Sequence, residues 1–270
     1  MARRLVLCCD TGTDDAIAIM VAALHPGLDL AGVCSVFGNA PVEATTANSR
    51  RVLADVGRAG VPVVPGSAAA GSRTSAAVEW LLALLRRTPE PVTVVATGPL
   101  TDLAALVQAD PSVVGRVDEL VVMGGNFGVG AAGPVERNLG NDPAAAAAVL
   151  AAGFRKVVLV PLDATWQALM GSPEVEALRS LGSVAGSLAA GFVEDRIGAY
   201  ASMSLPGRAP VHDPLTVAYL LDPAVVALTP ARVVVAPDGR TTLGTGTANA
   251  EVALTCDADR FRELLLDALR

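Results

Sequence analysis

Two kinds of segment alternate over most of the chain, and this alternation constrains the fold more than any other feature. Short apolar runs rich in valine recur at Leu5–Cys9, Leu30–Phe37, Val61–Val64, Val92–Ala96, Leu120–Met123, Val157–Val160 and Arg232–Ala236. Alanine- and leucine-rich stretches of helical length lie between most of them, at Asp14–Leu24, Ala44–Ala59, Ala77–Arg87, Leu100–Gln108, Pro143–Ala152 and Ser187–Ala201. Continuous apolar strands alternating with helices are typical of a parallel sheet covered on both faces. We therefore predict an α/β fold: a doubly wound, mostly parallel β-sheet with helices on both faces.

Length and composition agree with one folded domain. The chain has 270 residues, of which 52% are hydrophobic and 17% charged, a balance typical of a globular protein. It shows neither an internal repeat nor a linker, so we predict a single domain over residues 1–270. No apolar run reaches the ~18 uninterrupted residues that a membrane span needs. The apolar run that follows the N-terminal arginines is too short for a secretory signal, so we expect a cytoplasmic protein without membrane contact.

Charge and residue usage exclude several classes of function. A net charge of −7 disfavours binding of DNA or RNA through their phosphates. The chain has 2 histidines, too few for a histidine-rich transition-metal site. Its four cysteines (Cys8, Cys9, Cys34 and Cys256) have neither zinc-site spacing nor the density of a disulfide scaffold, which predicts reduced thiols.

Polar and glycine residues follow most of the predicted strands. They are Asp10–Asp15 after the first strand, Gly38 and Asn39 after the second, Thr97–Pro99 after the fourth, Gly124–Asn126 after the fifth, and Leu162 and Asp163 after the sixth. In sheets of this kind ligands bind at the carboxyl ends of the strands. The sequence therefore predicts one binding site along this edge of the sheet.

Three carboxylates lie close together where the first strand turns into a helix, at Asp10, Asp14 and Asp15. They repel one another unless a positive charge lies between them, and a helix N-terminus offers only about half a charge. Oxygen ligands without His or Cys select a hard cation, Ca²⁺ or Mg²⁺. A single aspartate here would be read as a helix cap, but three favour a metal. Asp213, before Pro214, is a further candidate ligand or a second helix cap.

These segments resemble, in order, the motifs of the inosine–uridine-preferring nucleoside hydrolases. The matching segments are Asp10–Ile19, Val36–Asn39, Ala96–Asp102, Val122–Gly125, Glu136–Asn138 with Asp142 and Pro143, Leu162–Thr165 and His212–Pro214. Each motif is short and weak by itself. Because they occur in family order over nearly the whole chain, together they form a strong signal.

The resemblance implies a calcium-dependent enzyme that hydrolyses the N-glycosidic bond of a ribonucleoside, in purine or pyrimidine salvage. It implies that Ca²⁺ is bound by the carboxylates of Asp10, Asp15 and Asp213 and by the main-chain carbonyl of Thr97. Asp10 would also take a proton from the metal-bound water, and His212 would be the acid beside the leaving base. The implied substrate-binding residues are Asp14, Asn39, Met123, Glu136 and Asn138. The family also implies a homodimer or homotetramer.

The chain departs from the family pattern near the expected site. Cys8 replaces an aspartate two residues before Asp10, which strand alternation places on the same side. Thr11 replaces a proline, Arg137 a phenylalanine and Trp166 a histidine. Arg137 either faces solvent or pairs with a charged group of the substrate.

Two segments are expected to shape the base side of the site. Residues 66–77 are shorter than the family loop that closes over the base. The segment Glu194–Pro210 is the expected lid, with Tyr200 and Arg208 as possible base contacts. Phe127, Trp166 and Tyr200 are the candidates for stacking on the base, although a core position is the commoner reading for each.

Three functions are alternatives to a nucleoside hydrolase. A non-catalytic ribose- or nucleoside-binding protein on the same scaffold is the first alternative, favoured by Cys8 and the short loop. A Mg²⁺-dependent phosphatase of the haloacid dehalogenase type needs a nucleophilic aspartate where Cys8 stands. A dinucleotide-binding enzyme is disfavoured because no Gly-x-Gly-x-x-Gly follows the first strand.

Overall fold

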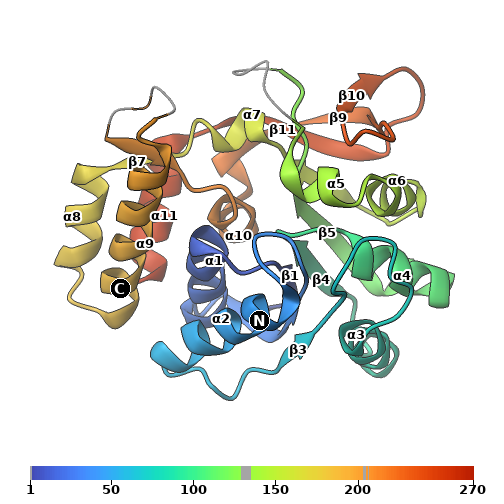
Figure 1. The fold of residues 1–270 in the computed structure, drawn as a ribbon, viewed down its shortest axis with the longest axis horizontal. Helices are drawn as coiled ribbons and strands as arrows, with labels where there is room; N and C mark the ends of the chain where they lie inside the picture. The colour runs from blue at the N-terminus through green and yellow to red at the C-terminus, as the bar shows by residue number, and fades with distance from the viewer. Residues whose placement is uncertain (1, 129–134, 203–204, 206) are drawn as a thin grey trace.

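The central element of the fold is a long twisted β-sheet (Figure 1). The computed structural model describes residues 2–128, 135–202, 205 and 207–270. Within them the sheet has nine strands, in the order β10-β9-β11-β6-β5-β4-β1-β2-β3. Their bounds are β1 (Arg3–Cys9), β2 (Leu28–Ser35), β3 (Val63–Pro65), β4 (Val92–Ala96), β5 (Val117–Met123), β6 (Val157–Val160), β9 (Val226–Val235), β10 (Thr241–Gly244) and β11 (Ala250–Cys256).

The first six strands are all parallel and take the order 3-2-1-4-5-6 of a doubly wound sheet. The chain moves outward from β1 through β2 to β3, and then returns to place β4 on the other side of β1. The order therefore reverses between β1 and β4, and the carboxyl ends of these two strands open the crevice in which such folds bind ligands. The predicted fold class is confirmed.

The other edge of the sheet is mixed. β11 pairs with β6 in parallel, whereas β9 pairs with β11, and β10 with β9, in antiparallel fashion. The predicted strand Arg232–Ala236 corresponds to the second half of β9, but β10 and β11 were not predicted. β9 is largely exposed and alternates little, so its sequence carries a weak strand signal. A small separate sheet joins β7 (Leu169–Gly171) to β8 (Arg208–Pro210).

Helices cover both faces of the sheet (Figure 1). One face is packed by α1 (Thr13–Leu24), α2 (Val42–Asp55), α8 (Ser172–Ser180), α9 (Val184–Tyr200), α10 (Pro214–Leu221) and α11 (Ala258–Ala268). The other is packed by α3 (Ala76–Arg87), α4 (Thr101–Ala109) and α6 (Pro143–Ala151). Two short helices, α5 (Arg137–Asn141) and α7 (Leu162–Thr165), follow β5 and β6. α8 and α11 were not predicted from the sequence.

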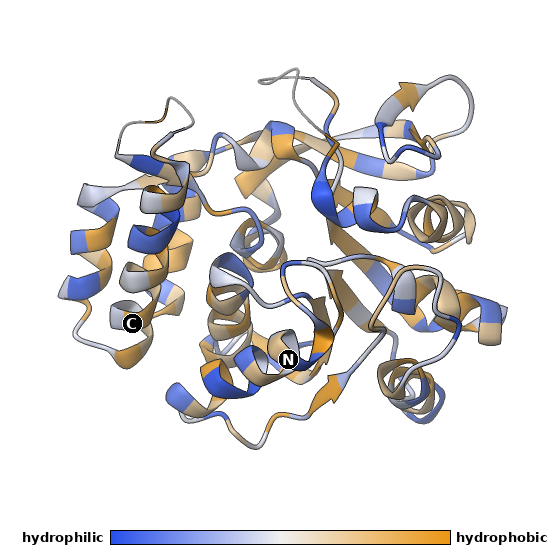
Figure 2. Ribbon diagram, in the orientation of Figure 1, coloured by the Kyte–Doolittle hydropathy of each residue, from blue (hydrophilic) through white to orange (hydrophobic). Residues whose placement is uncertain are grey.

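The burial of α1 explains why the site lies deep in the molecule. This helix is buried on every side, so its sequence is apolar apart from the first turn, which carries Asp14 and Asp15. It starts directly after β1, with Asp15 accepting a hydrogen bond from the backbone N–H of Gly12 over 2.9 Å. The central strands are likewise apolar (Figure 2). The helices of the described residues are all too short or too polar to cross a bilayer.

Candidate active site

A pocket of about 580 Å³ lies at the carboxyl ends of the central strands. It is lined by Asp14, Asn39, Thr97, Met123, Asn126, Val135, Glu136, Arg137, Asn138, Leu162, Trp166, Arg196, Tyr200, Leu205, His212 and Asp213. The predicted ligand, substrate-binding and acid residues thus line one cavity, except for Asp10 and Asp15, which lie buried beside it. The convergence predicted for the strand ends is borne out by this placement.

Asp10 occupies the end of β1 and is 2% exposed. One carboxylate oxygen, Oδ2, accepts a hydrogen bond from the backbone N–H of Asn39 over 2.6 Å. The other oxygen, Oδ1, is buried and has no hydrogen-bond partner among the described residues. Gly38 is required beside it, because a Cβ there would collide with the carboxylate. A buried carboxylate oxygen without a donor is costly unless a cation or a proton satisfies it.

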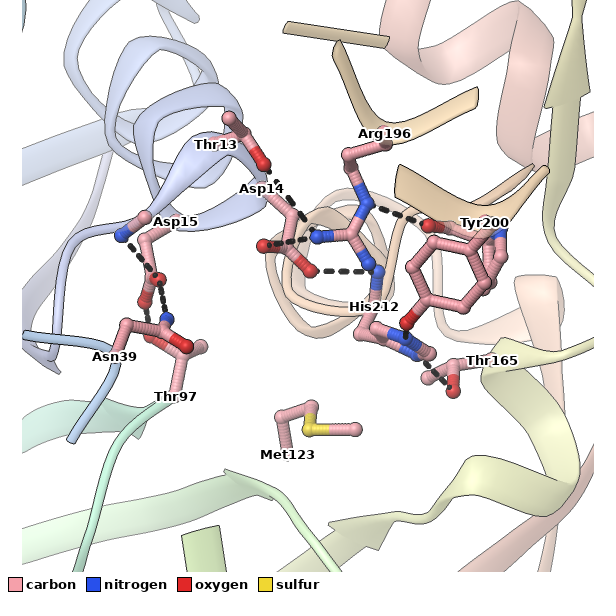
Figure 3. Close-up of polar contacts among 12 residues, drawn as sticks. Thr13, Asp14, Asp15, Asn39, Thr97, Met123, Thr165, Arg196, Tyr200 and His212 are labelled. Carbon is pink, nitrogen blue, oxygen red and sulfur yellow. Dashed lines mark hydrogen bonds and ion pairs between the residues drawn. The ribbon is translucent and has the colours of Figure 1, made fainter. Parts of the chain in front are cut away.

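Asp15 is held at the start of α1 by groups from three segments. Its Oδ1 accepts a hydrogen bond from Thr97 Oγ1 over 2.7 Å, and its Oδ2 accepts from Gly12 N and, over 3.4 Å, from Asn39 Nδ2. Thr97 follows β4, so this contact spans the crevice between β1 and β4 (Figure 3). Burial and the charge of Asp14 raise the pKa of Asp15 to about 6.

The carboxylates of Asp14, Asp15 and Asp213 come within 4.8 Å of one another. Burial raises the pKa of Asp213 well above its usual value, and the charges of Asp14 and Asp15 raise it further. The pKa of Asp10 is raised in the same way, by burial and by Asp15. Three buried carboxylates with raised pKa values, a fourth carboxylate beside them and an unsatisfied oxygen on Asp10 fit a hard cation, because its charge would stabilise the ionised cluster.

The wall beneath the pocket is built around Asn138 and Glu136. Asn138 Nδ2 donates hydrogen bonds to the main-chain carbonyls of Thr97, over 2.9 Å, and Met123, over 3.1 Å. The Thr97 carbonyl keeps a second lone pair, so this bond is compatible with metal binding. The carboxylate of Glu136 caps α5, accepting from the N–H groups of Asn138, Leu139 and Gly125. Burial raises the pKa of Glu136.

The opposite wall is aromatic. The rings of Trp166, Tyr200 and His212 lie 5.8 to 6.4 Å apart. His212 Nδ1 lies 2.7 Å from Thr165 Oγ1, and its Nε2 lies 3.2 Å from the Tyr200 hydroxyl. Burial and the charge of Arg196 lower the pKa of His212 to about 4, so the ring is neutral at pH 7 and carries a single proton.

Sequence reasoning missed Arg196, which joins Asp14 of the carboxylate cluster to Tyr200 of the aromatic wall. Its guanidinium forms an ion pair with Asp14 over 2.8 Å, and its Nε donates to the carbonyl of Pro210 over 2.7 Å (Figure 3). The one available signal was its position four residues before Tyr200, which places both side chains on the same face of α9. Thr165, the hydroxyl beside His212, was missed as a contact because 47 residues separate the two.

The residues that depart from the family pattern lie in different surroundings, some buried and one exposed. Cys8 is buried in the hydrophobic cluster on the α3–α4 face and pairs with Cys34 and Ala96 of the neighbouring strands. Thr11 is buried, with its hydroxyl 2.6 Å from that of Ser49. Arg137 is exposed and lines the pocket. All four cysteines are unbridged.

The short loop over residues 66–75 is tied to the helices of one face. Ser67 and Ser75 donate hydroxyl hydrogen bonds of 2.7 and 2.8 Å to Asp102. Gly71 N donates to Asp142 over 2.9 Å. The residues that line the pocket come from other segments, so this loop contributes no wall to it.

The segment expected to form a lid has mixed structure. Its first part, up to Tyr200, is the end of helix α9, and its last part contains β8; residues 203, 204 and 206 lie outside the described residues. Among the proposed base contacts, Trp166 and Tyr200 line the pocket. Phe127 packs instead against the hydrophobic cluster of the α3–α4 face, and Arg208 is exposed, with a 3.3 Å hydrogen bond to the carbonyl of Leu169.

Proteins of known sequence resemble this chain over its whole length. A pyrimidine-specific ribonucleoside hydrolase, RihA, of Escherichia coli O127:H6 is 32% identical, with 100% of this chain and 99% of the relative covered. The protein of the same name in Citrobacter koseri is also 32% identical, covering 98% of its own length. The family model of the inosine-uridine preferring nucleoside hydrolases matches residues 5–263.

Solved structures agree with the sequence relatives. A purine-preferring ribonucleoside hydrolase from Gardnerella vaginalis superposes with a TM-score of 0.90 at 26% identity, with 99% of this chain and 98% of that chain covered. A plant nucleoside hydrolase has the same fold, with a TM-score of 0.92 at 24% identity and coverage of 100% and 99%. Fold, strand-end residues and relatives therefore lead to one assignment. The chain belongs to the family of inosine–uridine-preferring nucleoside hydrolases, enzymes that act on N-glycosyl bonds.

Proposed function

We propose that the protein hydrolyses the N-glycosidic bond of ribonucleosides in a calcium-dependent reaction in which Asp10 is the general base. The observation that carries this proposal is the buried Oδ1 of Asp10, which lacks a hydrogen-bond partner among the described residues and lies beside a cluster of further carboxylates. An oxygen-only donor set of this kind suits Ca²⁺, which takes ~6–8 oxygen ligands. Asp10, Asp15, Asp213 and the Thr97 carbonyl would hold the ion.

A bound Ca²⁺ would orient the ribose hydroxyls and lower the pKa of a water molecule. The protein's own part begins with Asp10: the Asn39 N–H fixes its Oδ2, and its carboxylate would take the proton of the attacking water. The ribose is held between Asp14 and Asn39 on one side and Asn138 and Met123 on the other, which all line the pocket. Holding the sugar firmly favours the oxocarbenium-like transition state of glycosidic cleavage.

Departure of the base is helped by the aromatic wall. His212 is neutral at pH 7 and lies between two hydroxyl groups, those of Thr165 and Tyr200. Each hydroxyl can donate or accept a hydrogen bond, so the member of this series nearest the base would give it one proton as the C–N bond breaks, and the proton released by the attacking water balances that transfer over the turnover. His212 and Tyr200 both line the pocket, and Trp166 offers a ring face for the base.

The test is release of free ribose from a panel of purine and pyrimidine ribonucleosides, with a nitrophenyl riboside as an easily cleaved substrate. Both base classes belong in the panel, because one relative is named pyrimidine-specific and another purine-preferring. We expect ribose release that requires Ca²⁺ and stops when a chelator is added. Calcium binding without ribose release, even from the nitrophenyl riboside, would overturn the proposal in favour of a nucleoside-binding protein.

A matched pair of variants makes this test specific. Asp10→Asn removes the proposed base, whereas Asp29→Asn changes a half-exposed aspartate whose partner is Arg4 at the far end of β1. Loss of turnover in the first variant and unchanged turnover in the second are expected. Equal rates in both would show that Asp10 is not the base.

A further inference from the structure

One largely buried arginine separates the carboxylates of the site into two groups. Arg196 Nη1 lies 2.8 Å from Asp14 Oδ1, and the two side chains are 11% and 7% exposed. Asp15, by contrast, accepts hydrogen bonds from neutral groups: a hydroxyl, a backbone N–H and an amide. Figure 3 shows Asp14 turned toward Arg196 and Asp15 turned toward Thr97 and Asn39. Neighbouring residues of one helix thus have carboxylates with different electrostatic partners.

This difference matters because distance alone does not choose the metal ligands. Asp14, Asp15 and Asp213 have carboxylate oxygens close enough to bind one ion together. A carboxylate that already neutralises a guanidinium is a weaker ligand for a cation, because the two positive charges repel each other. The second oxygen of Asp14 also has a partner, the backbone N–H of His212 at 3.3 Å.

We propose that Arg196 is a positioning residue that keeps the Asp14 carboxylate away from the metal and presents it to a ribose hydroxyl. The inference rests on the proposed function, since it concerns the ligands of the same calcium site. Arg196 comes from α9 and Asp14 from α1, so the ion pair also fixes the helix that carries the base side to the helix that carries the metal side.

Two further contacts fix the guanidinium in this role. Its Nε donates to the carbonyl of Pro210, two residues before His212, and its carbon lies 5.3 Å from the centre of the Tyr200 ring. A guanidinium held by a carboxylate, a carbonyl and an aromatic face has a single orientation. Arg196 therefore orients Asp14, the backbone before His212 and the Tyr200 ring together.

The experiment is calcium titration of the metal-free protein, which reads the site without turnover. Arg196→Gln removes the nearby positive charge and releases Asp14, so we expect the Kd for Ca²⁺ to fall about fivefold. In the same variant the KM for a ribonucleoside should rise about tenfold, because Asp14 is no longer held for the ribose. Tighter metal binding with poorer substrate binding is a result that a merely structural role does not give.

Arg179→Gln is the matched control. Arg179 also forms an ion pair with α9, through Glu194, but both partners lie on the surface, where such pairs contribute little. Its calcium Kd and KM should stay within about twofold of the native values. Arg196→Lys keeps the charge and should leave the calcium Kd nearly native, with only a partial rise in KM.

A double-variant cycle with Asp14→Asn tests whether Asp14 is the group released. In that background Arg196→Gln should tighten calcium binding only about twofold, because only the loss of the arginine charge remains. Equal tightening in both backgrounds, or weaker calcium binding in Arg196→Gln, would overturn the proposal. If the native protein bound calcium but released no ribose, the proposed function would be wrong. The calcium titrations of the variants would still test the role of Arg196. Absence of calcium binding would overturn both.

Discussion

The two halves of the pocket are built in different ways. The half proposed to bind metal and ribose is formed by residues at the ends of β1, β2 and β4, where the backbone N–H groups of Gly12 and Asn39 donate to the carboxylates of Asp15 and Asp10. The base half is formed by α7, α9 and the chain after β8, where side chains contact other side chains, as in the Thr165–His212–Tyr200 series. The first half depends on the backbone of a rigid sheet, the second on packing between helices.

We expect this difference to separate the residues that carry out the reaction from those that select the base. Backbone donors are present whatever the surrounding side chains, so the geometry around Asp10 tolerates sequence change elsewhere. Contacts between side chains change with each substitution, so the base half is where relatives with one fold can prefer different bases. Replacements in the first half should therefore affect all substrates equally, and those in the second should depend on the leaving base.

The largest effect is expected from Asp10→Asn. Because the variant lacks the proposed base, kcat should fall about 10³-fold for every ribonucleoside and for the nitrophenyl riboside alike. Initial rates of ribose release, measured at saturating Ca²⁺, give the ratio for each substrate. A loss confined to some bases would contradict the division between the two halves.

A smaller and selective effect is expected from His212→Phe. The phenyl ring keeps the aromatic wall but cannot carry a proton, so kcat for ordinary ribonucleosides should fall about 10²-fold. The nitrophenyl riboside needs no proton on its leaving group, and its rate should change less than about threefold. Equal losses for the two substrate types would remove His212 from the acid role.

The two halves should also respond in opposite directions to acid when the protein is metal-free. The pKa of Asp15 is raised to about 6 in the folded state, so its destabilising charge is lost as pH falls from 7.5 to 5 and the fold gains stability. The pKa of His212 is lowered to about 4, so the unfolded chain takes up a proton that the folded chain refuses, and stability falls over the same interval.

Single variants resolve these opposing contributions. Acidification from pH 7.5 to 5 should raise the melting temperature of metal-free His212→Phe more than that of the native protein, and that of Asp15→Asn less, each by a difference of a few degrees at about 2–4 °C per kcal/mol. Asp10 and Asp213, whose pKa values are also raised, remain in all three proteins. Calorimetry in the presence of a chelator measures both. Adding Ca²⁺ should raise the melting temperature more at pH 7.5 than at pH 5, because protons compete for the carboxylates. If Ca²⁺ raised the melting temperature more at pH 5 than at pH 7.5, the result would argue against carboxylate ligands.

The smallest effect is expected from Cys8→Asp. It places one more negative charge on the same side of β1 as Asp10, so the calcium Kd should fall about threefold. Burial of a carboxylate against the apolar cluster around Cys8 should at the same time lower the melting temperature. Cys8→Ser, which adds no charge, is the control; an unchanged Kd in Cys8→Asp would assign the position to packing alone.

Local patterns in the sequence were enough to predict the parallel core of the sheet and most residues of the half proposed to bind ribose. Buried strands such as Val92–Ala96 are apolar throughout, and the residues that follow them lie at one edge of the sheet by topology alone. The same reasoning failed at β10 and β11, where half-exposed strands carry no clear period. The sequence showed that residues 66–77 form a short segment, but not that Asp102 and Asp142 bind this segment to the helices.

What the sequence determined by itself is therefore the sheet, its ligand-binding edge and the carboxylates placed there, because these depend on residues close together in the chain. Only the tertiary structure decided which carboxylate has a cation partner and what surrounds His212. Arg196 contacts Thr13 in the first turn of α1, and 183 positions of sequence separate the two residues. No local pattern encodes such a contact, because it depends on how α1 and α9 pack against the same face of the sheet.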